Sequence, residues 1–275
     1  MTLSTNTMMT TKINDTPSVA LLRYEMGEGV MAFSTMRHGA GVSQGNYADF
    51  NINRYCGDDP EAVRRNRGLF SQTVGVDDDR LVFPHQTHGT EVRLIDDAFF
   101  SLPADAQATT LEGVDAVMTQ LHDVCVGVST ADCIPVLLYD QEHHAVCAVH
   151  AGWRGTVARI AEKAVGTMQM TFHTDPAHLC AVIGPGISMK NFEVGEEVYQ
   201  TFADAGFDMS AITRRYAKWH IDLPLCNQLQ LTAVGVPSSQ IHQSGICTYD
   251  ACDRFFSARR LGVQSGRIFS GILLV

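Results

Sequence analysis

Two residues with reactive side chains flank a pair of apolar segments in the stretch STADCIPVLLYDQEHHAVCAVHAGWRG, residues 129–155. Cys133 begins the first segment, and His150 ends the second. A thiol and an imidazole can form a nucleophile with its base, and the same two groups are ligands for soft metal ions. Cys133 is therefore a candidate nucleophile, a candidate metal ligand or a buried core thiol.

The two apolar segments, CIPVLLYD and HAVCAVH, are predicted to pair as a β-hairpin. A four-residue loop, DQEH, would place Tyr139 opposite His144 and Cys133 opposite His150. Directly opposed Cβ atoms in a hairpin lie ~5 Å apart, so a sulfur and a ring nitrogen could bind the same ion. A slip of one residue would place the two side chains on opposite faces.

A metal site needs at least one more ligand, and the segment FPHQTHGTEV offers His85 and His88. This polar segment between two apolar ones is predicted to be a loop, where functional groups commonly lie. One thiolate with two imidazoles suits zinc better than magnesium or calcium. Three protein ligands also leave a fourth zinc position for water or substrate, as catalysis requires.

Composition predicts a compact globular protein that binds neither nucleic acid nor membrane. Of the 275 residues, 45% are hydrophobic and 18% are charged, with a formal net charge of −10. An acidic chain without a basic stripe is a poor match for nucleic-acid phosphates. The chain contains no apolar run of about 18 residues, so no membrane span is predicted.

The polar residues 1–18 are predicted to be a mobile tail, and residues 19–275 a single domain. The tail lacks the apolar centre of a secretory signal, so we expect a cytoplasmic protein whose eight cysteines are reduced.

Hydrophobic periodicity predicts a mixed α/β sandwich, or α+β fold, with mixed β-sheets packed against helices. Besides the hairpin, strands are predicted at 30–36, 90–95, 114–119, 123–129, 179–184, 240–246 and 267–275. Helices are predicted at 57–75, 156–170, 194–202 and 222–235. Asp59 and Pro60 suit the N-cap and first turn of the first helix.

Several long motifs resemble the laccase-domain family, also described as multicopper polyphenol oxidase-like or peptidoglycan-editing-factor proteins. They include STADCIPVLLYD, AVHAGWRGTV, CGDDPEAVRRNR, HQTHGTEV, IGPGIS, DLPLCNQLQL and FFSARR, in the family's order from about residue 30 to the C-terminus. RHGAGVS and ADFNINRY depart from the family pattern and could alter substrate contacts, but neither contains a proposed metal ligand.

The resemblance implies a zinc site formed by His88, Cys133 and His150. It also implies phosphorolysis of adenosine, inosine and methylthioadenosine, deamination of adenosine, and a fold similar to the catalytic domain of cytotoxic necrotizing factor toxins. A multicopper centre is not expected, because none of the 11 histidines forms a His-x-His pair. Copper is then an adventitious or alternative occupant of the zinc site.

Each implied reaction needs further residues. Zinc deaminases of nucleobases carry a glutamate proton shuttle in an H-x-E motif, which is absent around His88 and His150. Asp132 is the nearest carboxylate in sequence to Cys133, and it is either a proton shuttle or a turn-forming partner of a ligand.

Phosphorolysis needs a phosphate site, for which Arg154 is the first candidate because it precedes the helix expected from Thr156. Arg37, Arg259 and Arg260 are further candidates, with surface ion pairs as the alternative reading. Trp153 or Phe255 could stack on a purine, although core packing explains either ring as well.

Two other functions remain open from the residues. One is a metal-free cysteine hydrolase, with Cys133 as nucleophile and His150 as base, acting on an amide such as a peptidoglycan precursor. The other is a non-enzymatic module whose zinc is structural.

Overall fold

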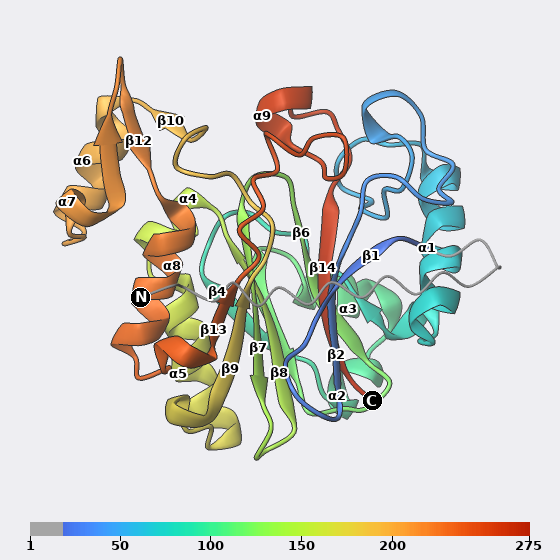
Figure 1. Cartoon of the computed structure of the whole chain (residues 1–275). Coiled ribbons are helices and arrows are strands. Elements are labelled where there is room, and N and C mark those ends of the chain that lie inside the picture. The colour runs from blue at the N-terminus through green and yellow to red at the C-terminus, as the bar shows by residue number, and fades with distance from the viewer. Residues whose placement is uncertain (1–18) are drawn as a thin grey trace.

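The computed structural model describes residues 19–275, and the tail expected at residues 1–18 lies outside the described part. Two large mixed sheets face each other (Figure 1). The first contains, in spatial order, β1 (Leu21–Tyr24), β2 (Val30–Thr35), β14 (Ile268–Leu274), β6 (Cys125–Thr130) and β3 (Leu81–Val82). The second contains β13 (Ile241–Gln243), β9 (Leu179–Ile183), β7 (Ile134–Asp140), β8 (Ala145–Ala151), β5 (Val114–Thr119) and β4 (Glu91–Leu94).

A small third sheet and the helices complete the fold. The third sheet contains β10 (Glu193–Val194), β12 (Trp219–Ile221) and β11 (Thr213–Arg215). The helices are α1 (Pro60–Val74), α2 (Asp97–Phe100), α3 (Ala104–Thr110), α4 (Trp153–Val157), α5 (Ile160–Phe172), α6 (Glu196–Asp204), α7 (Met209–Ile212), α8 (Leu223–Ala233) and α9 (Ala258–Leu261). Parallel pairs (β3–β6, β4–β5 and β9–β13) occur among antiparallel ones, which confirms the predicted mixed α+β architecture.

The sheets bury apolar side chains on both of their faces. Val126 and Ile272 of the first sheet share a cluster with Leu137 and Val146 of the second. On the outer face of the second sheet lie α5 and α8, and on the outer face of the first lies α1, whose Phe70 ring is 5.4 Å from that of Phe269 (Figure 1). Strands β7 and β8 are buried on both faces, which explains their continuous apolar sequence.

The β7–β8 hairpin has a register two residues away from the predicted one. Pro135, rather than Cys133, lies opposite His150, and the loop runs over 141–144. The predicted register was wrong because Asp140 belongs to the strand, and its carboxylate accepts backbone N–H groups of the turn that follows. A shift of two residues preserves the face that each side chain takes, so Cys133 and His150 can still meet.

The helix expected from near Thr156 is divided into α4 and α5. Arg159 interrupts it with a left-handed backbone (φ 65°), and its guanidinium lies 3.8 Å from the centre of the Phe207 ring. Asn227 and Gln230 of α8 donate hydrogen bonds to the side chain and the carbonyl of Thr156. These tertiary contacts override the local helical pattern.

Two smaller predictions also differ from the structure. The strand predicted as the first is the second, because β1 precedes it and pairs with it. Val194 belongs to β10 and not to a helix with Val198 and Phe202, because α6 begins at Glu196. Among the described residues, none of the helices has both the length and the apolar character needed to cross a membrane.

The close packing of β6 against β14 predicts that an added methyl group at Gly127 will destabilise the protein. Gly127 of β6 pairs with Gly271 of β14, and a Cβ on Gly127 would overlap the Phe269 ring. We expect Gly127→Ala to lower the free energy of unfolding by about 1–3 kcal/mol. Gly68→Ala in α1, where a Cβ meets nothing within 4 Å, is the control and should raise it by about 0.4–1 kcal/mol. Urea unfolding followed by circular dichroism measures both, and equal stabilities would contradict this packing.

Candidate metal centre

Three side chains from separate segments converge at one end of the two large sheets. His88 lies in the loop between β3 and β4, Cys133 directly precedes β7, and His150 lies in β8. One ligand atom of each lies within 4.8 Å of the ligand atoms of the other two. His88 is exposed, whereas His150 is buried, so the cluster reaches the surface at His88. The structure therefore brings together the three ligands expected from the sequence.

His85, the other histidine of the same loop, is bonded elsewhere. Its Nδ1 lies 2.8 Å from the carboxylate of Glu112, and its ring stacks on Tyr55 at 4.3 Å. The two histidines therefore have different surroundings although only two residues separate them.

The carboxylate of Asp115 positions both histidine ligands. It is fully buried in β5 and accepts hydrogen bonds from the backbone N–H groups of Thr87, His88 and Gly89, at 3.2, 3.0 and 2.7 Å. It also lies 2.7 Å from Nδ1 of His150. With Nδ1–H donating to a carboxylate, Nε2 is the nitrogen of His150 that remains for a metal.

The sequence analysis did not identify Asp115. A signal existed, because Asp115 is the one charged residue in the otherwise apolar or neutral segment VDAVMT. A carboxylate in a fully buried strand needs partners, which makes it a candidate for a functional role. Its hydrogen bonds to His150 and to the loop outweigh the effect of burial, and they lower its pKa below the usual value.

Gln86 attaches the His88 loop to the other sheet. Its side-chain amide donates to the carbonyl of Ser129 at 2.8 Å and accepts from the Ser129 N–H at 2.7 Å. The loop is thus bonded to β6 through Gln86 and to β5 through Asp115. This double attachment supports the left-handed backbone of His88 (φ 64°), which is uncommon for a residue other than glycine.

The cluster favours the thiolate form of Cys133. Burial raises the pKa of the Cys133 thiol, but the neighbouring His150 and His88 outweigh burial, and the pKa falls to about 6. Burial lowers the pKa of His150, while Cys133 and Asp115 raise it, with a net result of about 9. Without a metal, the two groups therefore form a thiolate–imidazolium pair. A metal would displace the imidazolium proton and use the same thiolate.

Gly152 allows the backbone to approach the cluster closely. A Cβ at this position would lie 2.8 Å from Cδ2 of His88, 3.2 Å from Sγ of Cys133 and 3.7 Å from Cε1 of His150. A side chain here would therefore collide with the ligands, and glycine fits without displacing them. Two imidazoles and one thiolate, in a cluster that reaches the surface at His88, suit zinc with a fourth position for water or substrate.

Asp132 makes contacts that match the second of its two predicted roles. Its backbone is left-handed (φ 85°), and its carboxylate accepts hydrogen bonds from the hydroxyls of Thr248 and Ser257 and from the N–H of Arg259. It therefore forms the turn that precedes Cys133 and connects it to the C-terminal segment.

The four arginines predicted as phosphate ligands differ in whether their guanidinium groups already have hydrogen-bond partners. Arg37 donates to the carbonyls of Ala48 and Cys252, and Arg259 donates to carbonyls of the 191–193 segment. Arg154 lies 4.2 Å from the centre of the Trp153 ring, and Arg260 lies 5.0 Å from the centre of the Tyr249 ring. Within residues 19–275, no hydrogen bond or ion pair engages the guanidinium of Arg154 or Arg260.

The two aromatic candidates are also placed differently. Phe255 is only 1% exposed and packs in a core cluster, so it presents no face for stacking. Trp153 is partly buried against the core beside α5 and α8, and its ring contacts Arg154. Of the two rings, only Trp153 could contact a ligand without rearrangement of the core.

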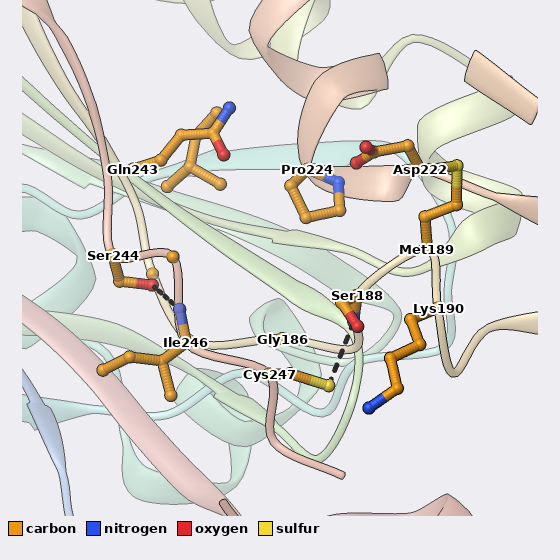
Figure 2. Close-up of a pocket in the computed structure, with 13 residues that line it drawn as sticks. Gly186, Ser188, Met189, Lys190, Asp222, Pro224, Gln243, Ser244, Ile246 and Cys247 are labelled. Carbon is orange, nitrogen blue, oxygen red and sulfur yellow. Dashed lines mark hydrogen bonds between the residues drawn. The ribbon is translucent and has the colours of Figure 1, made fainter. Parts of the chain in front are cut away.

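A cavity of about 310 Å³ adjoins the Cys133 loop (Figure 2). Gly186 lines this cavity, and a Cβ at Gly186 would lie 3.2 Å from the carbonyl oxygen of Cys133. Cys247 also lines the cavity, and its sulfur accepts hydrogen bonds from Ser188 and Asn191. Burial raises the pKa of Cys247, but these bonds outweigh it and lower the pKa below the usual value. Cys247 is thus a second cysteine with a lowered pKa, and it lines the cavity that adjoins the Cys133 loop.

Fold and site together define a laccase-like protein with a compact His/Cys/His cluster. The chain belongs to the family described as multi-copper polyphenol oxidoreductase laccase, whose model matches residues 31–275. The likeness to this family expected from the sequence motifs is therefore confirmed.

Relatives and solved structures cover nearly the whole chain. A purine nucleoside phosphorylase of Bacteroides thetaiotaomicron is 49% identical over 245 residues, which are 88% of this chain and 90% of the relative. Adenosine deaminase RL5, from an unknown prokaryotic organism, is 44% identical over 248 residues, 89% of this chain and 94% of that protein. The crystal structure of YlmD from Geobacillus stearothermophilus has a TM-score of 0.85 at 29% identity, and the match covers 96% of this chain and 98% of that one.

Because Asp115 positions the histidine ligands, replacing its carboxylate by an amide is expected to weaken metal binding. In Asp115→Asn, an amide NH₂ would face N–H donors that now bond a carboxylate oxygen. We expect the dissociation constant for zinc to rise about 10–100-fold. Competition titration with a chromogenic chelator measures the constant, and Asp105→Asn, in exposed α3, is the control. Unchanged zinc affinity in Asp115→Asn would contradict the positioning role.

The close approach of Gly152 to the ligands predicts a second effect. The Cβ of Gly152→Ala would displace His88 and crowd the sulfur of Cys133. We expect weaker zinc binding, with the dissociation constant raised at least about tenfold, a cost of roughly 1.4 kcal/mol, because the ligands can no longer meet at their present positions. Gly166→Ala in α5, where a Cβ meets nothing within 4 Å, is the matched control. Identical zinc affinity in the two variants would show that the close packing at Gly152 does not affect the centre.

Proposed function

We propose that this chain is a zinc-dependent purine nucleoside enzyme. It phosphorolyses adenosine, inosine and methylthioadenosine, and it deaminates adenosine. The observation that carries the proposal is the cluster of two imidazoles and one thiolate, which reaches the surface at His88. The relatives named purine nucleoside phosphorylase and adenosine deaminase support the substrate class.

The chain holds its cofactor through His88, Cys133 and His150. Zinc at this position would supply Lewis-acid chemistry, polarising a substrate atom and making water more acidic. Asp115 orients His150, and the attached loop presents His88, so the donors are arranged before any ion binds. Copper suits the same donor set and is kept as an alternative or adventitious occupant.

Phosphate is the second substrate that the chain must hold. Arg154 follows His150 closely in sequence, and its guanidinium lies on Trp153 without an ionic partner among the described residues. A free guanidinium can donate two parallel hydrogen bonds to a phosphate oxygen pair. Arg260 is the second phosphate ligand of the proposal, whereas Arg37 is assigned to the structure of its loop.

The carboxylates near the cluster favour phosphorolysis as the main reaction. Deamination needs a proton carrier, which in nucleobase deaminases is a glutamate. Both oxygens of Asp115 and both oxygens of Asp132 already accept hydrogen bonds. Phosphorolysis does not require such a carboxylate, because the phosphate itself is the nucleophile.

A metal-free cysteine hydrolase is the second candidate function. Cys133, His150 and Asp115 have the order of contacts expected for a nucleophile, its base and the group that orients the base. Its substrate would be an amide, such as a peptidoglycan precursor. A non-enzymatic module with structural zinc is the third, but the exposure of His88 favours an open site over a closed one.

We also propose that residues 19–275 form one domain and that the protein is cytoplasmic. The single domain is supported by the apolar cluster that the two large sheets share, because a division between the sheets would expose this cluster. No role in binding nucleic acid or membrane is proposed.

Phosphate-dependent turnover tests the proposed function. Purified protein, loaded with zinc, is incubated with adenosine or inosine with and without phosphate, and products are separated by chromatography. We expect free base and ribose 1-phosphate, formed only with phosphate, and a smaller phosphate-independent conversion of adenosine to inosine. His88→Ala should lose stoichiometric zinc and at least about 100-fold of the turnover, whereas His85→Ala, in the same loop, should retain both.

If the protein is instead a cysteine hydrolase, a different outcome is expected. Activity would then survive complete removal of metal by a chelator and be abolished by thiol alkylation. Because the pKa of Cys247 is also lowered, alkylation is performed in a Cys247→Ser background. Phosphate-dependent turnover that persists without metal would contradict the zinc proposal.

A further inference from the structure

Asp132 directly precedes the candidate metal ligand Cys133 and is hydrogen-bonded to three segments that are distant in sequence. Oδ1 accepts the hydroxyls of Thr248 and Ser257, both at 2.7 Å, and Oδ2 accepts the N–H of Arg259 at 2.6 Å. The backbone carbonyl of Asp132 accepts the N–H of Ile187 at 2.8 Å. Thr248 and Ser257 are fully buried, so water does not compete for these bonds.

Two of these partners adjoin an arginine–aromatic pair. Ser257 precedes α9 and accepts the N–H of Arg260 on the same hydroxyl oxygen that donates to Asp132. Thr248 precedes Tyr249, whose ring lies 5.0 Å from the guanidinium carbon of Arg260. Both members of the Arg260–Tyr249 pair are thus attached to Asp132 through an immediate neighbour.

Local structure alone cannot hold Arg260 in place. Helix α9 has only four residues, and so short a helix is unstable without tertiary contacts. Its first turn is held by Ser257 and by the bond from Arg259 to Asp132. In Figure 1, α9 lies at the end of the molecule where α4 follows β8, which is the end that carries the cluster.

We propose that Asp132 is a positioning residue that holds Arg260 as a phosphate ligand at a set distance from the Cys133 loop. The inference rests on the proposed function, which already takes Arg260 as the second phosphate ligand beside Arg154, and it adds the residue that holds Arg260 in place. Asp132 itself transfers no proton in this role, since its oxygens are occupied by three donors. Its left-handed backbone suits an Asp or Asn, so an Asn variant keeps the turn.

Asp132→Asn separates positioning from proton transfer. The amide oxygen can accept the Arg259 N–H while the NH₂ group donates to the two hydroxyls, so the contacts persist without a titratable proton. We expect kcat within about threefold of the wild type and an unchanged pH profile, because loss of a general acid or base costs about 10²–10⁴-fold. A loss of that size, with a missing limb of the pH profile, would overturn the proposal.

Removing the hydroxyls tests positioning without a change at Asp132. In the double variant Thr248→Val/Ser257→Ala, the carboxylate of Asp132 loses the two hydroxyl donors that precede Tyr249 and α9, and it keeps only the N–H of Arg259. We expect the KM for phosphate to rise about tenfold or more, as loss of a charged hydrogen bond predicts. The KM for the nucleoside, the value of kcat at saturating phosphate and the zinc content should stay near those of the wild type. Thr232→Val, on the exposed side of α8, is the matched control.

Arg260→Gln identifies the group that is positioned. It should raise the KM for phosphate as the double variant does, and the triple variant should show little further increase, because both changes act through one guanidinium. A double variant that only lowers the melting temperature, with the KM for phosphate unchanged, would show a merely structural role and overturn the inference.

Failure of the proposed function remains distinguishable from failure of this inference. If wild-type protein turns over no nucleoside, binding of inorganic phosphate to the zinc-loaded protein is measured by calorimetry. Phosphate binding that is weakened in the double variant and in Arg260→Gln would support Asp132 positioning although the reaction is wrong. Wild-type protein that binds no phosphate would overturn both.

Discussion

The buried carboxylate of Asp115 is the constraint on which the candidate centre depends. Placed in a strand without access to water, it must be satisfied by donors from the protein. Those donors are three consecutive backbone N–H groups of the His88 loop and the ring of His150. One desolvated charge therefore determines the conformation of the loop and the orientation of the imidazole. The same carboxylate bonds the backbone N–H of His88 and the ring of His150. The positions of both histidines are therefore set by β5 and do not depend on a bound ion.

A second carboxylate, Asp132, acts on the third ligand from the other direction. It forms the turn before Cys133 and binds the segment that leads to α9. Both carboxylates near the cluster are thus used as hydrogen-bond acceptors, and Cys133 is the anionic group left beside two imidazoles. Gly152, which has no side chain, allows the backbone to approach all three ligands without a clash. The site therefore contains few reactive groups, and the carboxylates of Asp115 and Asp132 that support them already have hydrogen-bond partners.

The sequence predicted those parts of the fold that local patterns control. Helix α1 begins after Asp59 with Pro60 in its first turn, as its capping residues indicated, and the apolar segments of β5 to β9 are strands. The hairpin prediction was wrong in register but right in face, because a shift of two residues preserves side-chain alternation. This explains how Cys133 and His150 were correctly paired from an incorrect alignment. The break at Arg159 had no local signal, since contacts with Phe207 and α8 produce it.

The sequence by itself determined the class of the fold, the family and the three candidate ligands, because strand periodicity and long contiguous motifs are properties of neighbouring residues. Only the tertiary structure decided what those ligands can do. Asp115 and Gln86 are separated from their partners by 26 to 43 positions, and Asp132 by 116 to 127. Hydrogen bonds over such separations depend on how two sheets pack, and no pattern within a segment records that packing. The guanidinium of Arg37 is occupied, whereas those of Arg154 and Arg260 have no hydrogen-bond or ionic partner within residues 19–275, and the difference has the same cause.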